Sequence, residues 1–125
     1  MTKSAALFIG AMFVVSMARP GFATPETVTG KLVDMACYSM NKEETGNVHK
    51  RGGAKICAQA CAREGFDVGL LTTAGKVYVV RGGLTANHNA KLVPHMSHTV
   101  TISGEVSEKD GATELTAADL TMVSR

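Results

Sequence analysis

Hydrophobic and polar residues alternate along five short stretches of the chain, the period-two pattern of strands that have one buried face. The alternation covers residues 27–33, 66–70, 76–81, 99–106 and 113–123. In the third stretch the apolar positions of the alternation are Val77 and Val79. In the fifth stretch the phase slips by one residue, which predicts a bulge or bend near Ala118.

Turn signals separate these stretches in two places. Ala74-Gly75 lies between the second and third stretches and predicts a hairpin. Asp110-Gly111 lies between the fourth and fifth, and it predicts a tight hairpin turn because this dipeptide adopts positive φ readily. Strands two and three, and strands four and five, are therefore expected to be antiparallel neighbours.

Two segments follow a helical period instead. Residues 54–64 place small and apolar side chains, two of them cysteines, at helical spacing, and Gly65 follows as a C-terminal cap. Residues 84–93 show a weaker helical pattern that Pro94 ends. We expect a short helix in each segment.

This order of elements predicts a mainly β fold, a small five-stranded OB-like Greek-key barrel. The first short helix would lie in the long connection between the first two strands, residues 34–65, and the second would precede the fourth strand. All three cysteines of the chain lie in that long connection.

The first 23 residues have the pattern of a secretory signal peptide. Lys3 precedes eleven mostly apolar residues at 5–15, and we expect cleavage after Ala23, with Ala18 as the alternative. As a helix, this run would reach about 17 Å, short of a bilayer core of about 30 Å. We therefore expect a periplasmic or secreted protein, a single domain at 24–125, and no stable membrane span after cleavage.

Composition and charge make several functions less plausible. The 45% hydrophobic and 19% charged residues are ordinary for a globular domain. Loss of Lys3 and Arg19 with the signal peptide would reduce the basic residues from 13 to 11, equal to the 11 acidic ones. A formal charge of zero gives no broad positive field for phosphates or anionic lipid, and the chain has no tryptophan for base stacking. We expect no nucleic-acid partner.

Three cysteines and a histidine form the pattern C-x11-H-x7-C-x3-C, made of Cys37, His49, Cys57 and Cys61. Three thiols and one imidazole are the ligand set of a tetrahedral zinc site, and two or three thiolates also suit Cu(I), which prefers soft donors. Cys57 and Cys61, at i and i+4, would lie on one helix face with Cβ atoms roughly 5–6 Å apart. We expect these residues to bind copper or zinc, although the spacing differs from the paired knuckles of structural zinc sites.

A disulfide is the alternative use of the same cysteines. Thiols in an oxidising compartment are driven into disulfides unless a metal ion or burial protects them, and an odd number cannot pair completely. A bond within the helix would be strained at i and i+4, so Cys37 with one of the two helical cysteines is the favoured pair. The chain would then be a disulfide-stapled module that binds a periplasmic protein or a small ligand. Cys57 and Cys61 also suit simple packing on a core-facing helix.

A thiol-redox protein is a third interpretation. Redox enzymes more often carry C-x-x-C on a thioredoxin-like βαβ pattern, whereas this chain has C-x-x-x-C in a β-rich pattern. No catalytic residue is assigned, and the pattern favours a binding protein over an enzyme.

A second, weaker candidate for a metal site is His95, Met96 and His98. Imidazole and thioether donors together are a copper-type ligand set, although methionine is also a common core residue. Asp34, which ends the first strand, could orient a metal ligand or cap a turn.

Nearly the whole chain after residue 23 resembles small secreted or periplasmic bacterial domains that carry a Cys/His-bearing loop on an OB-like barrel. The resemblance rests on the runs VTGKLVDMACYSMNKEETGNVHKRGGAKICAQACAREGFDVGLLTTAGKVYVV and LVPHMSHTVTISGEVSEKDGATELTAADL. Its most specific part is the cysteine loop. The resemblance implies the fold and the export, and it assigns no activity.

Overall fold

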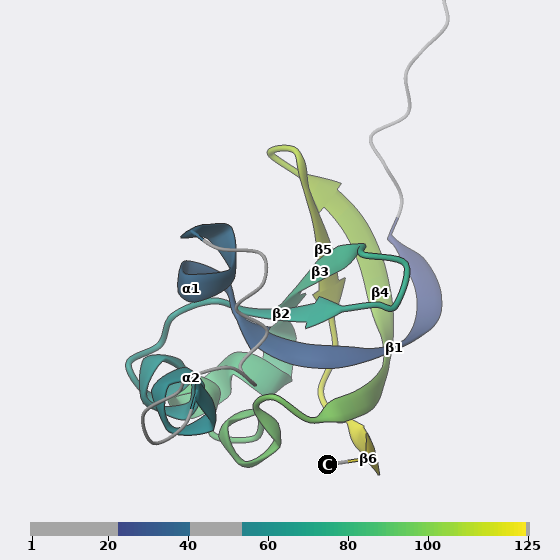
Figure 1. Cartoon of the computed structure of the whole chain (residues 1–125). Coiled ribbons are helices and arrows are strands. Elements are labelled where there is room, and N and C mark those ends of the chain that lie inside the picture. The colour runs from purple at the N-terminus through teal and green to yellow at the C-terminus, as the bar shows by residue number, and fades with distance from the viewer. Residues whose placement is uncertain (1–22, 41–53, 125) are drawn as a thin grey trace, which may run out of the picture.

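The structure is a computed structural model that describes residues 23–40 and 54–124 (Figure 1). The strands are β1 (Thr24–Asp34), β2 (Val68–Leu71), β3 (Val77–Arg81), β4 (Thr99–Lys109), β5 (Ala112–Thr116) and β6 (Thr121–Ser124). The helices are α1 (Met35–Met40), α2 (Ala54–Arg63) and α3 (Ala86–Asn89), with the 3-10 turns η1 (Gly82–Thr85) and η2 (Val93–His95).

Five of the strands close into a mixed barrel. β1 pairs antiparallel with β2 and with β4, and β2 pairs antiparallel with β3. β3 pairs parallel with β5, and β5 returns antiparallel to β4, which completes the ring. β6 continues along the edge of β4 beyond β5. The predicted OB-like five-stranded barrel is confirmed.

The turn chemistry of the sequence accounts for the hairpins. β2 and β3 are joined by a turn in which Gly75 has φ 83°. β4 and β5 are joined through Asp110 and Gly111, both at positive φ (51° and 78°), as the Asp-Gly signal predicts. The predicted interruption near Ala118 is also present, because the return strand divides into β5 and β6 around residues 117–120.

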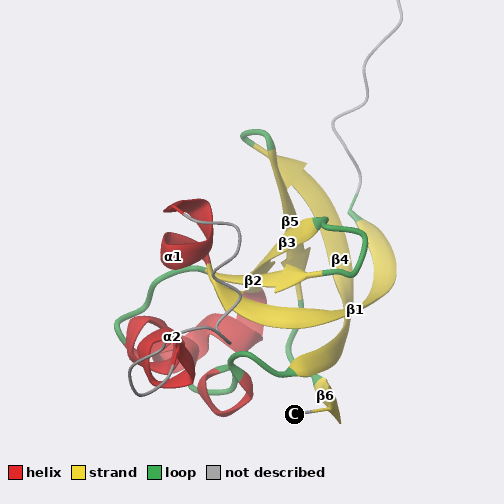
Figure 2. Cartoon of the chain, viewed as in Figure 1, coloured by secondary structure: helices red, strands yellow, loops and turns green. Residues whose placement is uncertain are grey.

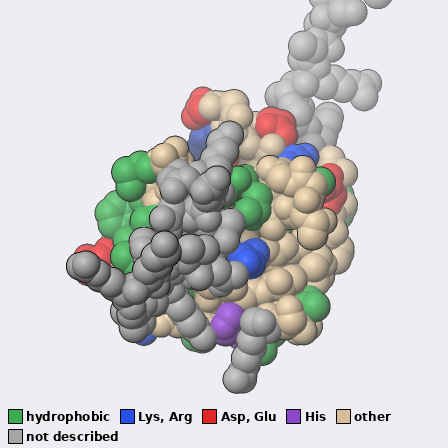
Figure 3. Space-filling view, viewed as in Figure 1, with side chains coloured by type: hydrophobic (Ala, Val, Ile, Leu, Met, Phe, Trp, Pro, Cys, Tyr) green, Lys and Arg blue, Asp and Glu red, His purple; other side chains and the backbone are tan. Residues whose placement is uncertain are grey.

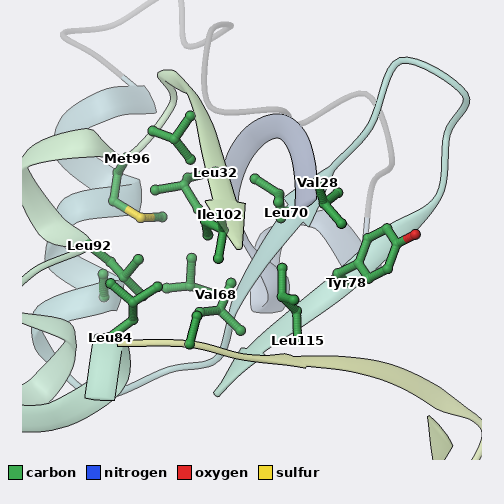
Figure 4. Packing of buried hydrophobic residues seen from close by; sticks show 14 of the residues in the cluster. Val28, Leu32, Val68, Leu70, Tyr78, Leu84, Leu92, Met96, Ile102 and Leu115 are labelled. Atoms are coloured by element: carbon green, nitrogen blue, oxygen red, sulfur yellow. The ribbon is translucent and has the colours of Figure 1, made fainter. Parts of the chain in front are cut away.

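The barrel core is formed by alternate residues of the strands (Figure 4). In β4 the buried residues are Val100, Ile102 and Val106, as the alternation predicts. In β3 the predicted phase is wrong: Tyr78 and Val80 are buried, at 7% and 0% exposed, and the two valines at 77 and 79 are only half-buried. The reason is that both sides of β3 are partly covered, so the alternation of apolar residues does not define the inner face.

The helices gather at one end and along one side of the barrel (Figure 2). α2 packs against β1, α3 and η2, and it contributes Ala58 and Ala62 to the core. The expected helix at 84–93 is divided into η1, α3 and η2, with Asn87, His88 and Asn89 in the left-handed region. The predicted short helix before β4 is therefore present as short helical turns, with a left-handed interruption at residues 87–89. α1 was not predicted.

Arg81 joins three parts of the fold. Its guanidinium donates to Glu114 of β5 from Nε at 2.6 Å and to Asp67, before β2, from Nη1 and Nη2 at 2.6 and 3.2 Å. The hydrogen bonds and charge of Arg81 lower the pKa of Asp67, and the partial burial of that carboxyl opposes the shift. The forked contact aligns the α2–β2 connection with the β3·β5 pair.

We expect Gly104→Ala to destabilise the fold by about 1–3 kcal/mol, the range for overpacking. A Cβ at this position would overlap the Thr116 carbonyl oxygen and come within 2.9 Å of the Ala117 side chain. Gly83→Ala is the matched control, because its Cβ would meet nothing closer than 3.4 Å. Urea unfolding of both variants measures the difference, and equal stability of the two would contradict the close approach of Thr116 and Ala117 to Gly104.

Asp67→Asn should lower the stability of the fold at neutral pH and make that stability less dependent on pH in the acid range. The folded-state pKa of Asp67 is depressed, so the ion pair contributes stability above the ordinary pKa of 3.8 and loses it as pH falls through the depressed value. Thermal unfolding of the wild type and the variant between pH 7 and pH 2 should show a gap that closes on acidification. A gap that is constant with pH would show that packing, not charge, accounts for the effect.

Candidate thiol site

Asp34 is the last residue of β1 and the N-cap of α1. Its Oδ1 accepts the backbone N–H of Ala36 at 3.2 Å, and its Oδ2 accepts that of Cys37 at 3.4 Å. The strand fixes its position, because Asp34 is paired with Val68 of β2 and is only 5% exposed. α1 therefore leaves the barrel at a defined point, and Cys37 lies in its first turn.

The structure brings Cys37 and Cys61 together beside Asp34. The thiols of Cys37, on α1, and Cys61, on α2, are each in hydrogen-bonding contact with the Asp34 carboxylate and with each other. Cys57 is close enough for its charge to act on both thiols. All three cysteines are free; Cys37 and Cys61 are half-buried, whereas Cys57 is exposed.

The C-terminal end of α2 is held in place by caps that the sequence analysis predicted only in part. The expected Gly65 cap is present: Gly65 has φ 88°, and its N–H donates to the Ala62 carbonyl at 3.0 Å. The nearly buried Asn89 donates from Nδ2 to the carbonyls of Ala62 at 2.8 Å and Phe66 at 3.0 Å. His88 Nδ1 donates to the Arg63 carbonyl at 3.0 Å.

These contacts explain why the chain accepts three left-handed residues in succession at 87–89. Each such non-glycine residue costs about 1–2 kcal/mol. The left-handed path places Asn89 and His88 so that they donate to the Ala62 and Arg63 carbonyls at the end of α2. Asn89 and His88 are thus positioning residues for the helix that carries Cys57 and Cys61. A run of Asn-His-Asn, whose outer residues tolerate positive φ, was the available signal.

The electrostatics keep the inner thiols protonated. The hydrogen bond to Asp34 is the main cause that raises the pKa of Cys37 to about 11, and burial and the carboxylate charge add to it. Burial is the main cause that raises the pKa of Cys61, with the charge and hydrogen bond of Asp34 next, while the hydrogen bond with Cys37 acts the other way. Because the thiolate is the nucleophile, this environment does not suit a thiol catalyst.

Two neighbouring thiols can either share a soft metal ion or form a disulfide. Within the described residues, no three His, Cys, Asp or Glu side chains are arranged to hold a metal ion. The converging sulfur donors are therefore a pair, Cys37 and Cys61, with Cys57 nearby. His49 of the predicted ligand set lies outside the described residues.

The members of the second candidate set, His95, Met96 and His98, differ in burial. Met96 is fully buried in the hydrophobic core, where Figure 4 shows its sulfur among the aliphatic side chains. His98 is buried and His95 is half-buried. The position of Met96 is accounted for by core packing.

The face of the molecule that carries α1 and α2 is more hydrophobic than the face formed by the strands. In Figure 3, hydrophobic side chains gather on the side where Figure 1 shows α1, whereas the strand surface is mostly neutral and polar. Met40 of α1 is 81% exposed and Phe66, just after α2, is 51% exposed. The thiol pair thus lies between two helices whose surroundings are partly apolar.

No family model, curated protein or solved structure matches this chain. In the part of the chain that the structure describes, no helix has the length and apolar character needed to cross a bilayer. The function is therefore argued from the thiol site itself.

Asp34→Asn should make Cys37 more reactive. The substitution weakens the hydrogen bond to residue 34, which is the main cause of the raised pKa, and removes the carboxylate charge. The Cys37 pKa therefore falls from about 11 toward the ordinary 9.0, and the thiolate fraction at pH 8 increases. Because a less basic thiolate is also a weaker nucleophile, the net gain in alkylation rate is about tenfold. Iodoacetamide labelling followed by peptide mass measurement gives this rate, with the exposed Cys57 of the same protein as reference. Equal acceleration of Cys37 and Cys57 would indicate general loosening instead.

Proposed function

We propose that this chain is a small exported binding protein that holds Cu(I) through the thiolates of Cys37 and Cys61. The observation that carries the proposal is the contact between these two thiols, which come from α1 and α2 and are 24 positions apart in the sequence. A metal site needs its ligands to be held close together by the fold before the ion binds, and this pair of thiols meets that requirement. The signal peptide that the sequence predicts in the first 23 residues supports a role outside the cytoplasm.

The number of converging donors favours copper over zinc. Structural zinc is almost always four-coordinate and tetrahedral, whereas soft thiolates select Cu(I), which accepts two or three of them. The described residues bring two half-buried thiols together and leave the third exposed. Zinc, the alternative metal, would require the third cysteine and the remaining predicted ligand, His49, to complete the set.

Binding of the ion must displace the two thiol protons. Both thiols have raised pKa values, so protons compete with the metal ion and the apparent affinity should fall as the pH is lowered. The site would release its ion more readily in acid.

A second candidate function is supported by the same contact. Two thiols in hydrogen-bonding contact are also suited to oxidation, and a Cys37–Cys61 disulfide would staple α1 to α2. The protein would then be a disulfide-stapled module that binds a periplasmic protein or a small ligand without metal, with Cys57 as the remaining thiol. A thiol-redox role is the third candidate and receives no support from the raised thiol pKa values.

The decisive experiment is intact mass with and without alkylation, plus elemental analysis, on protein exported by a bacterial host. The metal-binding function predicts three alkylatable thiols after the ion is removed, and about one copper per chain in the isolated protein or after anaerobic loading with Cu(I). A disulfide-stapled module predicts one alkylatable thiol, a mass lower by two hydrogens, and no stoichiometric copper.

Cys61→Ser should abolish stoichiometric Cu(I) binding and change the stability of the apo protein by less than about 1 kcal/mol. Ala60→Ser is the matched control, since residue 60 is an exposed position of the same helix. Copper content after gel filtration and urea unfolding of the apo forms measure the two effects. Retention of one copper ion by Cys61→Ser would contradict the assignment of the pair.

A further inference from the structure

We infer that Cys57 is the transfer ligand of this site: it accepts Cu(I) from a thiolate-bearing carrier and passes it to Cys37 and Cys61. This inference rests on the proposed function and assigns different roles to the three thiols. Cys37 and Cys61 retain the ion, and Cys57 carries it between solvent and the retaining pair.

The burial of the three thiols separates them into an inner pair and an outer member. Cys37 and Cys61 are half-buried and in contact with Asp34, whereas Cys57 is exposed on α2. A carrier that approaches α2 therefore meets the Cys57 sulfur before it can reach the inner pair.

The helix sets the path from the outer thiol to the inner pair. Cys57 and Cys61 are separated by one turn and have Cβ atoms roughly 5–6 Å apart. Helical side chains tilt toward the N-terminus, so the Cys61 side chain leans toward the turn that holds Cys57. The Gly65 cap and the contacts of Asn89 keep the C-terminal half of α2 in place during the exchange.

The transfer is a series of ligand exchanges with no change in oxidation state. A carrier complex with two thiolates on Cu(I) gives the ion to the Cys57 sulfur, and the Cys57 proton leaves with the first carrier thiolate as a thiol. Cys61 then replaces the second carrier thiolate and supplies its proton to it. Finally Cys37 replaces Cys57 on the ion and returns a proton to the Cys57 sulfur. In total, two protein thiols lose protons and two carrier thiols form.

The test is the rate at which reduced apo protein takes Cu(I) from its coloured complex with bicinchoninate, which stands in for the carrier. Stopped-flow loss of colour gives the rate, and the endpoint gives the affinity. Cys57→Ser should take up the ion roughly tenfold more slowly, because the nearby outer thiol no longer brings it to the pair. Its affinity should remain within about threefold of the wild type. Ala60→Ser should match the wild type in both.

The outcomes separate this inference from the proposed function. If the wild type binds Cu(I) and Cys57→Ser loads equally fast, the transfer role is wrong and the binding function stands. If Cys57→Ser loses affinity by the same factor as rate, Cys57 is a retaining ligand and the transfer role is again wrong. If the wild type takes no Cu(I) from the complex, the proposed function fails and the transfer role fails with it.

Discussion

The carboxylate of Asp34 connects the barrel to the thiol site. It ends β1, caps α1 through the N–H groups of Ala36 and Cys37, and contacts the thiols of Cys37 and Cys61. A nearly buried carboxylate needs such hydrogen bonds, because an unpaired charge away from water is strongly unfavourable. The Asp34 carboxylate therefore fixes where α1 leaves the barrel and where the Cys37 sulfur lies. It also raises the pKa values of the Cys37 and Cys61 thiols.

The second support of the site comes from a distant part of the chain. The connection between β3 and β4 reaches the end of α2, and there Asn89 and His88 bond to helix carbonyls. The cost of the left-handed backbone at these residues is offset by the satisfaction of groups that would otherwise lack partners. The barrel thus holds α1 from one side by Asp34 and α2 from the other by the β3–β4 connection. Two short helices that would be marginal alone are fixed relative to each other.

The local sequence patterns predicted most of the barrel, and they were less accurate where the conformation depends on residues distant in the sequence. The alternation of β4, the Asp110-Gly111 turn and the Gly65 cap depend on residues close in sequence, and the structure has all three. The inner face of β3 and the exact form of the helix expected at 84–93 depend on what packs against them. The predicted phase of β3 was wrong, and the short helix is divided into turns by left-handed residues. The left-handed backbone at residues 87–89 is accompanied by hydrogen bonds from His88 and Asn89 to carbonyls at the end of α2.

The sequence by itself determined the order of the strands along the chain, the hairpins and the set of thiols that could carry chemistry. Those features follow from periodicity, turn residues and residue type, which act over a few neighbours. Only the tertiary structure decided which sulfur atoms meet and which one stays exposed. Cys37 and Cys61 lie on separate helices, and both interact with the carboxylate of Asp34 at the end of β1. A pairing of that kind is set by packing across the chain, and no spacing in the sequence encodes it.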